Sequence, residues 1–291
     1  MKFNCITEYR AGLGESPIWS KDENRVYWID ILEPKILCTD ISNNKTHHWK
    51  MPSPVGMIAQ RKSGGLIVAL EDGIYGFDPS NGEISLLVNL EKAHKNNRPN
   101  DGKCDVKGRL WIGTMNNLDS MEASGAFYRV SPSLKIYKVD SELKIPNGLA
   151  WSPDNRVMYH TDTRSDMVYA YDFQPSNGLK LKKRKFFSYS RDKTGGVDGA
   201  AMDVEGGYWA ALYGGGKLVR IMPDGFIEKE IILPVTQPTM PAFGGVDMKT
   251  IFITTAKQKL GAKELFSQPL AGGLLSVKVD VPGHPVYSFA G

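Results

Sequence analysis

The stretch Asn147-Gly-Leu-Ala-Trp-Ser152 is one copy of a layout that recurs along the whole chain. It is followed by a turn-forming cluster, Pro153-Asp-Asn155, and then by the β-rich segment Val157-Met-Tyr159. Turn residues between short runs of aromatic and β-branched residues are typical of a β-hairpin. Residues 147–159 are therefore predicted to form two antiparallel strands, the first of which opens on a polar side chain.

Five further runs share this layout, and each is also followed by a turn cluster and a β-rich segment. They are Glu15-Ser-Pro-Ile-Trp-Ser20, Gly56-Met-Ile-Ala-Gln-Arg61, Asn100-Asp-Gly-Lys-Cys-Asp105, Asp198-Gly-Ala-Ala-Met-Asp203 and Ala242-Phe-Gly-Gly-Val-Asp247. The copies recur with a period of about 45 residues, the length of one four-stranded propeller blade. We therefore predict an all-β fold, a six-bladed β-propeller with four antiparallel strands per blade, that occupies residues 1–291 as one domain. The N-terminal residues are expected to add an outer strand to the last blade, which closes the ring and covers free sheet edges.

The composition fits a turn-rich globular chain and argues against a nucleic-acid partner. Hydrophobic residues make up 41% of the chain, which also contains 30 glycines and 17 prolines. A net charge of +4 is mild, and the one dense basic run lies at 180–185. A nucleic-acid surface normally carries several basic clusters interleaved with aromatic residues, so this run is better explained as a solvated outer hairpin.

The sequence also suggests where the protein works. It shows no apolar leader and no stretch of membrane-spanning length, so no membrane partner is expected. Cys5, Cys38 and Cys104 show no paired spacing, which suits a reducing compartment. We expect a cytoplasmic protein that is a monomer or a weak homo-oligomer.

The polar residues that open four of the six runs are the main candidates for a site. The innermost strands of a propeller run along its axis, so equivalent positions would bring Glu15, Asn100, Asn147 and Asp198 to one central channel. Two carboxylates in a low-dielectric channel repel each other unless a cation neutralises them. Carboxylate and amide oxygens favour Ca²⁺, Mg²⁺ or Mn²⁺, and also allow Zn²⁺ or Fe²⁺. The pattern thus predicts one divalent metal ion held by Glu15, Asn147 and Asp198, with Asn100 as a further candidate.

Each of these residues also has a purely structural interpretation. Glu15 could anchor a turn, Asn147 could satisfy nearby backbone groups, and Asp198 could cap a loop. Their occurrence at one register of the repeat favours the metal site over three separate structural roles.

A second group of candidates surrounds the predicted channel. The segment Asn96-Asn-Arg-Pro-Asn-Asp-Gly102 is expected to be a loop entering the third inner strand, with Arg98 at the channel mouth beside Asn100 and Asp101. A guanidinium there can bind hydroxyls or an oxyanion, and the alternative is an ion pair with Asp101. Glu122, in the polar loop 115–124 above the same blade, is the candidate acid to reach the substrate.

Other catalytic patterns find little support. The run His160-Thr-Asp162 resembles part of a catalytic array, but it falls on a second strand, one layer out from the channel, where contact between blades is the expected role. No serine-hydrolase elbow, phosphate-binding loop or dinucleotide fingerprint is present in the sequence.

Five ordered motifs together resemble the senescence marker protein 30, gluconolactonase and regucalcin family. They are Gly12-Leu-Gly-Glu-Ser-Pro-Ile-Trp19, Asn96-Asn-Arg-Pro-Asn-Asp-Gly102, Arg109-Leu-Trp-Ile-Gly-Thr-Met115, Pro146-Asn-Gly-Leu-Ala-Trp-Ser152 and Val197-Asp-Gly-Ala-Ala201. Members of that family are six-bladed propellers with one divalent metal in the central channel, and many hydrolyse sugar lactones. The resemblance implies that Glu15, Asn147 and Asp198 are metal ligands and that Arg98 and Asn100 bind substrate. An acidic residue after the Gly-Thr-Met motif contacts the sugar in some relatives, and Glu122 is its candidate here.

The leading hypothesis is metal-dependent hydrolysis of an aldonolactone, such as glucono-, xylono- or arabinonolactone, to the aldonic acid. The metal would polarise the carbonyl, and Asp198 would act as general base. Two alternatives stay open. The same site could hydrolyse organophosphates or aryl esters, or the propeller could be a non-catalytic calcium-binding or scaffolding protein.

Overall fold

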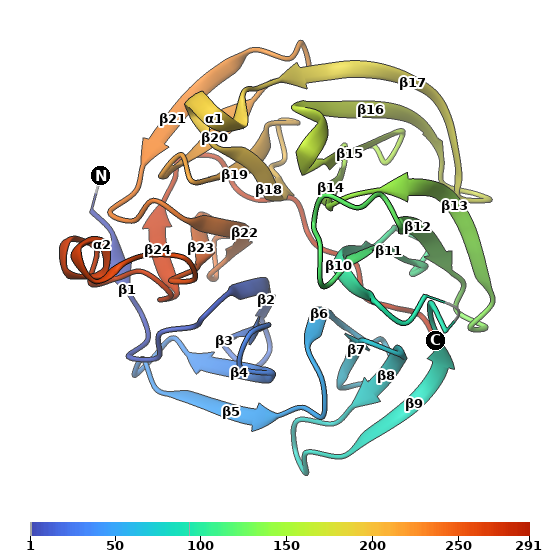
Figure 1. Cartoon of the computed structure of the whole chain (residues 1–291), viewed down its shortest axis with the longest axis horizontal. Coiled ribbons are helices and arrows are strands. Elements are labelled where there is room, and N and C mark those ends of the chain that lie inside the picture. The colour runs from blue at the N-terminus through green and yellow to red at the C-terminus, as the bar shows by residue number, and fades with distance from the viewer. Residues whose placement is uncertain (1, 93) are drawn as a thin grey trace.

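Six small β-sheets surround a central axis in the computed structural model, which describes residues 2–92 and 94–291 (Figure 1). Each sheet has four antiparallel strands, so the predicted six-bladed propeller is confirmed. Five blades are formed by consecutive strands. Blade 1 comprises β2 (Gly14–Ser20), β3 (Arg25–Asp30), β4 (Lys35–Asp40) and β5 (Thr46–Lys50); blade 2 comprises β6 (Val55–Gln60), β7 (Leu66–Leu70), β8 (Gly73–Phe77) and β9 (Ile84–Asn89); blade 3 comprises β10 (Asn97–Cys104), β11 (Leu110–Asn116), β12 (Gly125–Val130) and β13 (Ile136–Leu143); blade 4 comprises β14 (Pro146–Trp151), β15 (Val157–Asp162), β16 (Met167–Gln174) and β17 (Leu179–Ser188); blade 5 comprises β18 (Gly196–Met202), β19 (Tyr208–Tyr213), β20 (Lys217–Ile221) and β21 (Ile227–Ile232).

The sixth blade joins the two ends of the chain. It contains β22 (Pro238–Gly244), β23 (Thr250–Thr255) and β24 (Leu275–Lys278), and its outer strand is β1 (Asn4–Cys5) from the N-terminus. β1 pairs antiparallel with β24. The N-terminal strand therefore covers an edge of β24 that would otherwise be free.

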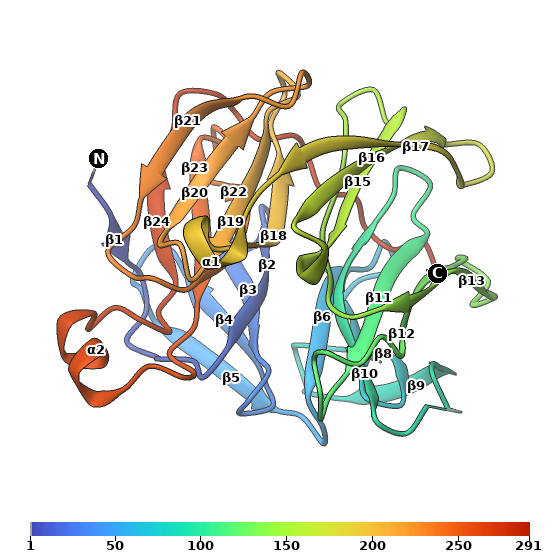
Figure 2. The ribbon, with the colours of Figure 1, turned by 45° about the horizontal axis from the view of Figure 1, so that its top comes forward.

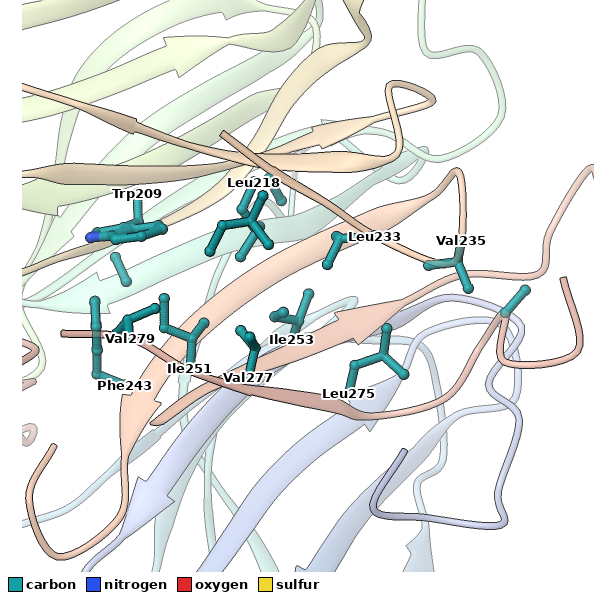
Figure 3. Close-up of a cluster of buried hydrophobic side chains, with 14 residues drawn as sticks. Trp209, Leu218, Leu233, Val235, Phe243, Ile251, Ile253, Leu275, Val277 and Val279 are labelled. Atoms are coloured by element: carbon teal, nitrogen blue, oxygen red, sulfur yellow. The ribbon is translucent and has the colours of Figure 1, made fainter. Parts of the chain in front are cut away.

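The hydrophobic core is divided into clusters that lie between neighbouring blades. Figure 3 shows the cluster between blades 5 and 6, where Trp209 and Leu218 face Phe243, Ile251 and Val277. Other buried clusters join blades 1 and 2, 2 and 3, 3 and 4, 4 and 5, and 6 and 1. Because each strand alternates its side chains between the two faces of its sheet, every blade packs on both of its neighbours. The clusters between blades therefore stabilise the ring, in place of a single core at the axis.

Helical structure is limited to short segments in the part of the chain that the structure describes. These are the 3₁₀ turn η1 (Thr163–Ser165), α1 (Arg191–Thr194) and α2 (Ala262–Ser267). None of the described helices is both long and apolar enough to cross a membrane. The basic run 180–185 lies on β17, the outer strand of blade 4, and most of its side chains are exposed, as the outer-hairpin interpretation predicted.

The C-terminal segment crosses the face of the propeller at which the inner strands end. It pairs in turn with blade 5 at Asp203, blade 3 at Cys104 and blade 2 at Arg61, and it ends near blades 2 and 3 (Figures 1 and 2). Phe289 in this segment is fully buried in the cluster between blades 2 and 3. The segment thus covers one end of the central channel.

One predicted run is displaced along its strand. Ala242 pairs with Phe252 and lines a small cavity of about 60 Å³ under the C-terminal segment, together with Ile18, Ala59 and Ala201. These residues lie well beyond the openings of their runs, so Ala242 is not equivalent to Glu15. The prediction was wrong here because the Gly-Gly-Val-Asp ending of 244–247 imitates the end of the other runs, while the inner strand itself begins at Pro238.

Candidate functional site

The polar residues that open the inner strands lie in one cavity at the other end of the channel. The cavity has a volume of about 570 Å³, and its wall contains Glu15, Arg98, Asn100, Asn147 and Asp198. These residues come from blades 1, 3, 4 and 5. A cavity of this size, with a few converging polar groups, is typical of a small-molecule site.

Irregularities in the inner strands direct these side chains toward the axis. The pairing of β2 with β3 shifts between Glu15 and Ile18, and that of β14 with β15 shifts between Asn147 and Ala150. The residues that follow Glu15 and Asn147 are left-handed, with φ of 49° at Ser16 and 67° at Gly148. Such bulges turn a side chain out of the regular alternation of a strand. β10 and β18 show corresponding shifts where they carry Asn100 and Asp198.

A continuous chain of hydrogen bonds connects three blades across the inner wall of the cavity. A guanidinium nitrogen of Arg98 donates to Oδ1 of Asn100 (3.0 Å), and Nδ2 of Asn100 donates to Oδ1 of Asn147 (3.0 Å). Nδ2 of Asn147 then donates to Oγ1 of Thr163 (3.0 Å), whose hydroxyl donates to the carbonyl of Val197 (2.8 Å). Each amide is oriented by both of its ends, so the wall is ordered before any ligand binds.

The carboxyl groups of Glu15 and Asp198 both have raised pKa values. Burial raises the pKa of Glu15 to about 8, and the charge of Asp101 adds to the rise while the Ser16 N–H, 2.9 Å from the Glu15 carboxylate, opposes it. Burial also raises the pKa of Asp198 well above its ordinary value, and the charges of Glu15 and Asp101 contribute. Two acids whose pKa values rise together in one cavity are typical of a functional site.

Arg98 supplies a buried positive charge beside these acids. Its burial lowers the pKa of the guanidinium to about 10, against the opposing charges of Glu15, Glu71 and Asp198. Its donors go to Oδ1 of Asn117 (3.1 Å), the carbonyl of Pro99 (2.8 Å) and Asn100. It forms no ion pair with Asp101 in the described structure, so that alternative is not realised.

Asp101 lies outside the wall of the cavity. Its carboxylate accepts a hydrogen bond from the backbone N–H of Leu149 (3.1 Å) in blade 4. The buried ammonium group of Lys103 donates to the carbonyls of Leu149 and Ala200, and the charge of Asp101 opposes the fall in the Lys103 pKa that burial causes. Asp101 and Lys103 therefore link the inner strands of blades 3, 4 and 5, and Lys103 also lines the smaller cavity.

Two of the predicted substrate-binding residues, Asp101 and Glu122, do not line the cavity. Glu122 is exposed, and its carboxylate accepts a hydrogen bond from Nδ2 of Asn116 (2.6 Å), so it holds the shape of its own loop. Asn117 and Ser120 of that loop line the cavity instead. His160 is buried one layer out, stacked on Phe127 of blade 3 at 4.6 Å between ring centroids, in the blade-to-blade role that was expected.

Sequence reasoning missed several residues of the wall. Thr163 follows the second strand of blade 4, and Asn117 follows that of blade 3. Both positions come directly after strands that pair with the runs opening on Asn147 and Asn100. The signal in the sequence was therefore their position directly after the second strand of each predicted hairpin.

The side-chain oxygens of Glu15, Asn147 and Asp198 are suitable ligands for a divalent cation. Among the described residues, no group donates a hydrogen bond to the Asp198 carboxyl, and Glu15 accepts one from the backbone of Ser16. The Asn147 carbonyl oxygen accepts from Asn100 and keeps a second lone pair. Two under-satisfied carboxyls and an amide oxygen are the hard ligands that Ca²⁺, Mg²⁺ and similar ions prefer.

Comparisons with known proteins agree along the whole chain. The family profile described as SMP-30/Gluconolactonase/LRE-like region matches residues 13–257. A 6-deoxy-6-sulfogluconolactonase from Pseudomonas putida is 35% identical over 99% of this chain and 98% of its own length, and regucalcin from Bos taurus is 31% identical over 100% and 99%. The crystal structure of a calcium-binding protein, regucalcin, from Agrobacterium tumefaciens superposes with a TM-score of 0.93 at 28% identity, covering 98% of this chain and 96% of that one.

Proposed function

The chain belongs to the SMP-30/gluconolactonase/LRE-like family, and we propose that it hydrolyses a sugar lactone to the open sugar acid in the 570 Å³ cavity. The observation that carries the proposal is the convergence of Glu15, Asn147 and Asp198 with Arg98 and Asn100 in one wall. The relative from Pseudomonas putida supports the proposal, since it is named a 6-deoxy-6-sulfogluconolactonase.

We propose that Glu15, Asn147 and Asp198 hold one divalent cation. The cation would supply Lewis-acid polarisation of the lactone carbonyl and charge compensation for the two acids. Because ligands must be deprotonated, the raised pKa values of Glu15 and Asp198 mean that cation binding releases protons. The resemblance of regucalcin, described as calcium-binding, supports Ca²⁺ as one candidate, beside Zn²⁺, Mn²⁺, Mg²⁺ and Fe²⁺.

The reaction requires little more than positioning and one proton carrier. Arg98 and Asn100 bind ring hydroxyls and orient the carbonyl toward the inner end of the cavity. Asp198 takes a proton from the water that attacks the carbonyl carbon, and it returns a proton to the ring oxygen as the C–O bond breaks.

A panel of aldonolactones, assayed by acid release with each divalent ion after chelation, tests this function. We expect opening of at least one glucono-, xylono- or arabinonolactone, and a loss of about 100-fold or more in Asp198→Asn. Asp280→Asn, whose carboxylate is 91% exposed, is the matched control and should retain full activity. Unchanged turnover in Asp198→Asn, or after complete chelation, would contradict the mechanism.

A second candidate is an aryl-ester or organophosphate hydrolase. Part of the mouth is apolar, with Leu32 and Leu118 exposed there by 55% and 77%, which suits an apolar leaving group. Assaying aryl esters and phosphotriesters beside lactones on one preparation separates the two. Tight cation binding without turnover of any of these substrates would instead favour a calcium-binding protein.

A further inference from the structure

The mouth of the cavity has two unlike halves. Loops of blades 4, 5 and 6 contribute Arg164, Arg191 and Lys259 to the wall. Blades 1 to 3 contribute mostly apolar side chains, which are Met115 of β11 and the loop residues Leu13, Ile31, Leu32, Pro54 and Leu118. The acids in the described wall are Glu15 and Asp198, which belong to the inner end. The outer wall on the side of blades 4 to 6 therefore contains three cationic side chains and no acidic side chain among its described lining residues.

Arg164 is held in place but keeps unused donors. The side chain of Asp162 caps η1 by accepting a hydrogen bond from the Arg164 backbone N–H (3.0 Å), which fixes this residue at the rim. One guanidinium N–H group donates to Oγ of Ser120 in blade 3 (3.0 Å). Nε is buried and has no hydrogen-bond partner among the residues that the structure describes. A guanidinium has five N–H donors, so an incoming ligand can find several of them free.

The other two cations are also incompletely paired. Arg191 forms one ion pair, from Nε to Oδ1 of Asp166 at 2.7 Å, and Asp166 does not line the cavity. Lys259 is exposed, and no hydrogen bond or ion pair joins its ammonium group to another described residue. Guanidinium groups match phosphate and sulfonate oxygens in geometry, and a lysine adds a point charge.

We propose that this basic half of the mouth is an anion subsite, and that the substrate is a sugar lactone with a negatively charged group on the carbon farthest from its carbonyl. This inference rests on the proposed lactonase function. The carbonyl lies at the inner end near Asp198, and the phosphate, sulfonate or carboxylate of the substrate lies against Arg164, Arg191 and Lys259. The C–H surface of the sugar packs on the apolar half, around Leu118.

The test compares glucono-lactone with the same lactone carrying a phosphate or a sulfonate on its sixth carbon. We expect kcat/KM to favour a charged lactone by about tenfold or more at low ionic strength, and the preference to shrink as salt screens the rim. Arg164→Gln and Lys259→Gln should each reduce the ratio of charged to neutral kcat/KM several-fold. Arg184→Gln, the same substitution on the exposed outer strand of blade 4, should leave the ratio unchanged.

Equilibrium binding of the product acids separates this inference from the proposed function. Calorimetry with 6-phosphogluconate, 6-deoxy-6-sulfogluconate and gluconate needs no turnover. Tighter binding of an acid with the additional phosphate or sulfonate than of gluconate, with the difference lost in Arg164→Gln, supports the subsite even if no lactone is hydrolysed. Equal kcat/KM for neutral and charged lactones, or equal affinity for the three acids, would overturn the subsite while leaving lactone hydrolysis standing.

Discussion

Replacing Glu15 by glutamine should stabilise the metal-free protein at pH 8. The pKa of Glu15 rises from its ordinary 4.5 to about 8 in the folded chain, mainly because the carboxyl is buried. Between these two values the folded chain keeps a proton that the unfolded chain releases. The free energy of unfolding therefore falls as the pH rises through this window. Glutamine has almost the same shape, carries no charge, and can still accept the hydrogen bond from the Ser16 N–H.

The size of the effect follows from the same pKa. Multiplying the rise from 4.5 to about 8 by 1.36 kcal/mol per pH unit gives an upper bound of about 5 kcal/mol. Because the carboxyl borders a cavity that water can enter, solvent screening reduces the expected gain to roughly 2 kcal/mol. For a chain of this length that gain corresponds to about 4 °C in Tm.

Thermal unfolding of chelated protein at pH 5 and pH 8 measures the prediction. The Tm of Glu15→Gln should exceed that of the unmodified chain at pH 8, and the difference should shrink at pH 5. Glu8→Gln, at an exposed position, should change neither value. Saturating Ca²⁺ should reverse the order at pH 8, because a ligand stabilises the state that binds it and the variant has lost a carboxylate ligand. A lower Tm for Glu15→Gln at pH 8 in chelator would refute the reasoning.

Three further substitutions test the structure around the site. Thr163→Val removes the hydroxyl that orients Asn147, so kcat/KM should fall about tenfold with little change in Tm. Gly148→Ala places a Cβ 2.5 Å from the Tyr208 hydroxyl at a φ of 67°, and should lower the free energy of unfolding by about 2–3 kcal/mol in denaturant titrations. Phe289→Ala empties a fully buried position and should cost about 3–5 kcal/mol in the same titrations, while kcat/KM at low temperature is retained.

Matched variants give each of these tests a reference. Thr163→Ser keeps a hydroxyl and should restore most of the lost activity. Gly214→Ala has a similar φ of 81° but open space around the added Cβ, so it should cost only about 1 kcal/mol. Phe226→Ala removes a ring that is 73% exposed and should be nearly neutral. Equal effects in a variant and its reference would show that the stated contact is not the cause.

The repeat made the architecture predictable from the sequence. Turn clusters and strand alternation are local signals, and their recurrence about every 45 residues predicts the number of blades without any knowledge of contacts. The same regularity predicted that Glu15, Asn100, Asn147 and Asp198 would share one end of the channel, and the structure places all four in one cavity wall. It was less reliable in the sixth blade, where a glycine-rich ending imitated the repeat at the wrong end of β22.

Only the tertiary structure decided which loop residues reach the cavity. Loops carry no periodicity, so the sequence suggested Glu122, whereas the hydrogen bond from Asn116 holds that acid at the surface and Asn117 faces Arg98. The basic half of the mouth combines Arg164, Arg191 and Lys259, which are far apart in the chain and become neighbours of one cavity when the ring closes. A short-range pattern determines strands and their register, but the composition of a rim depends on how distant loops meet around the axis.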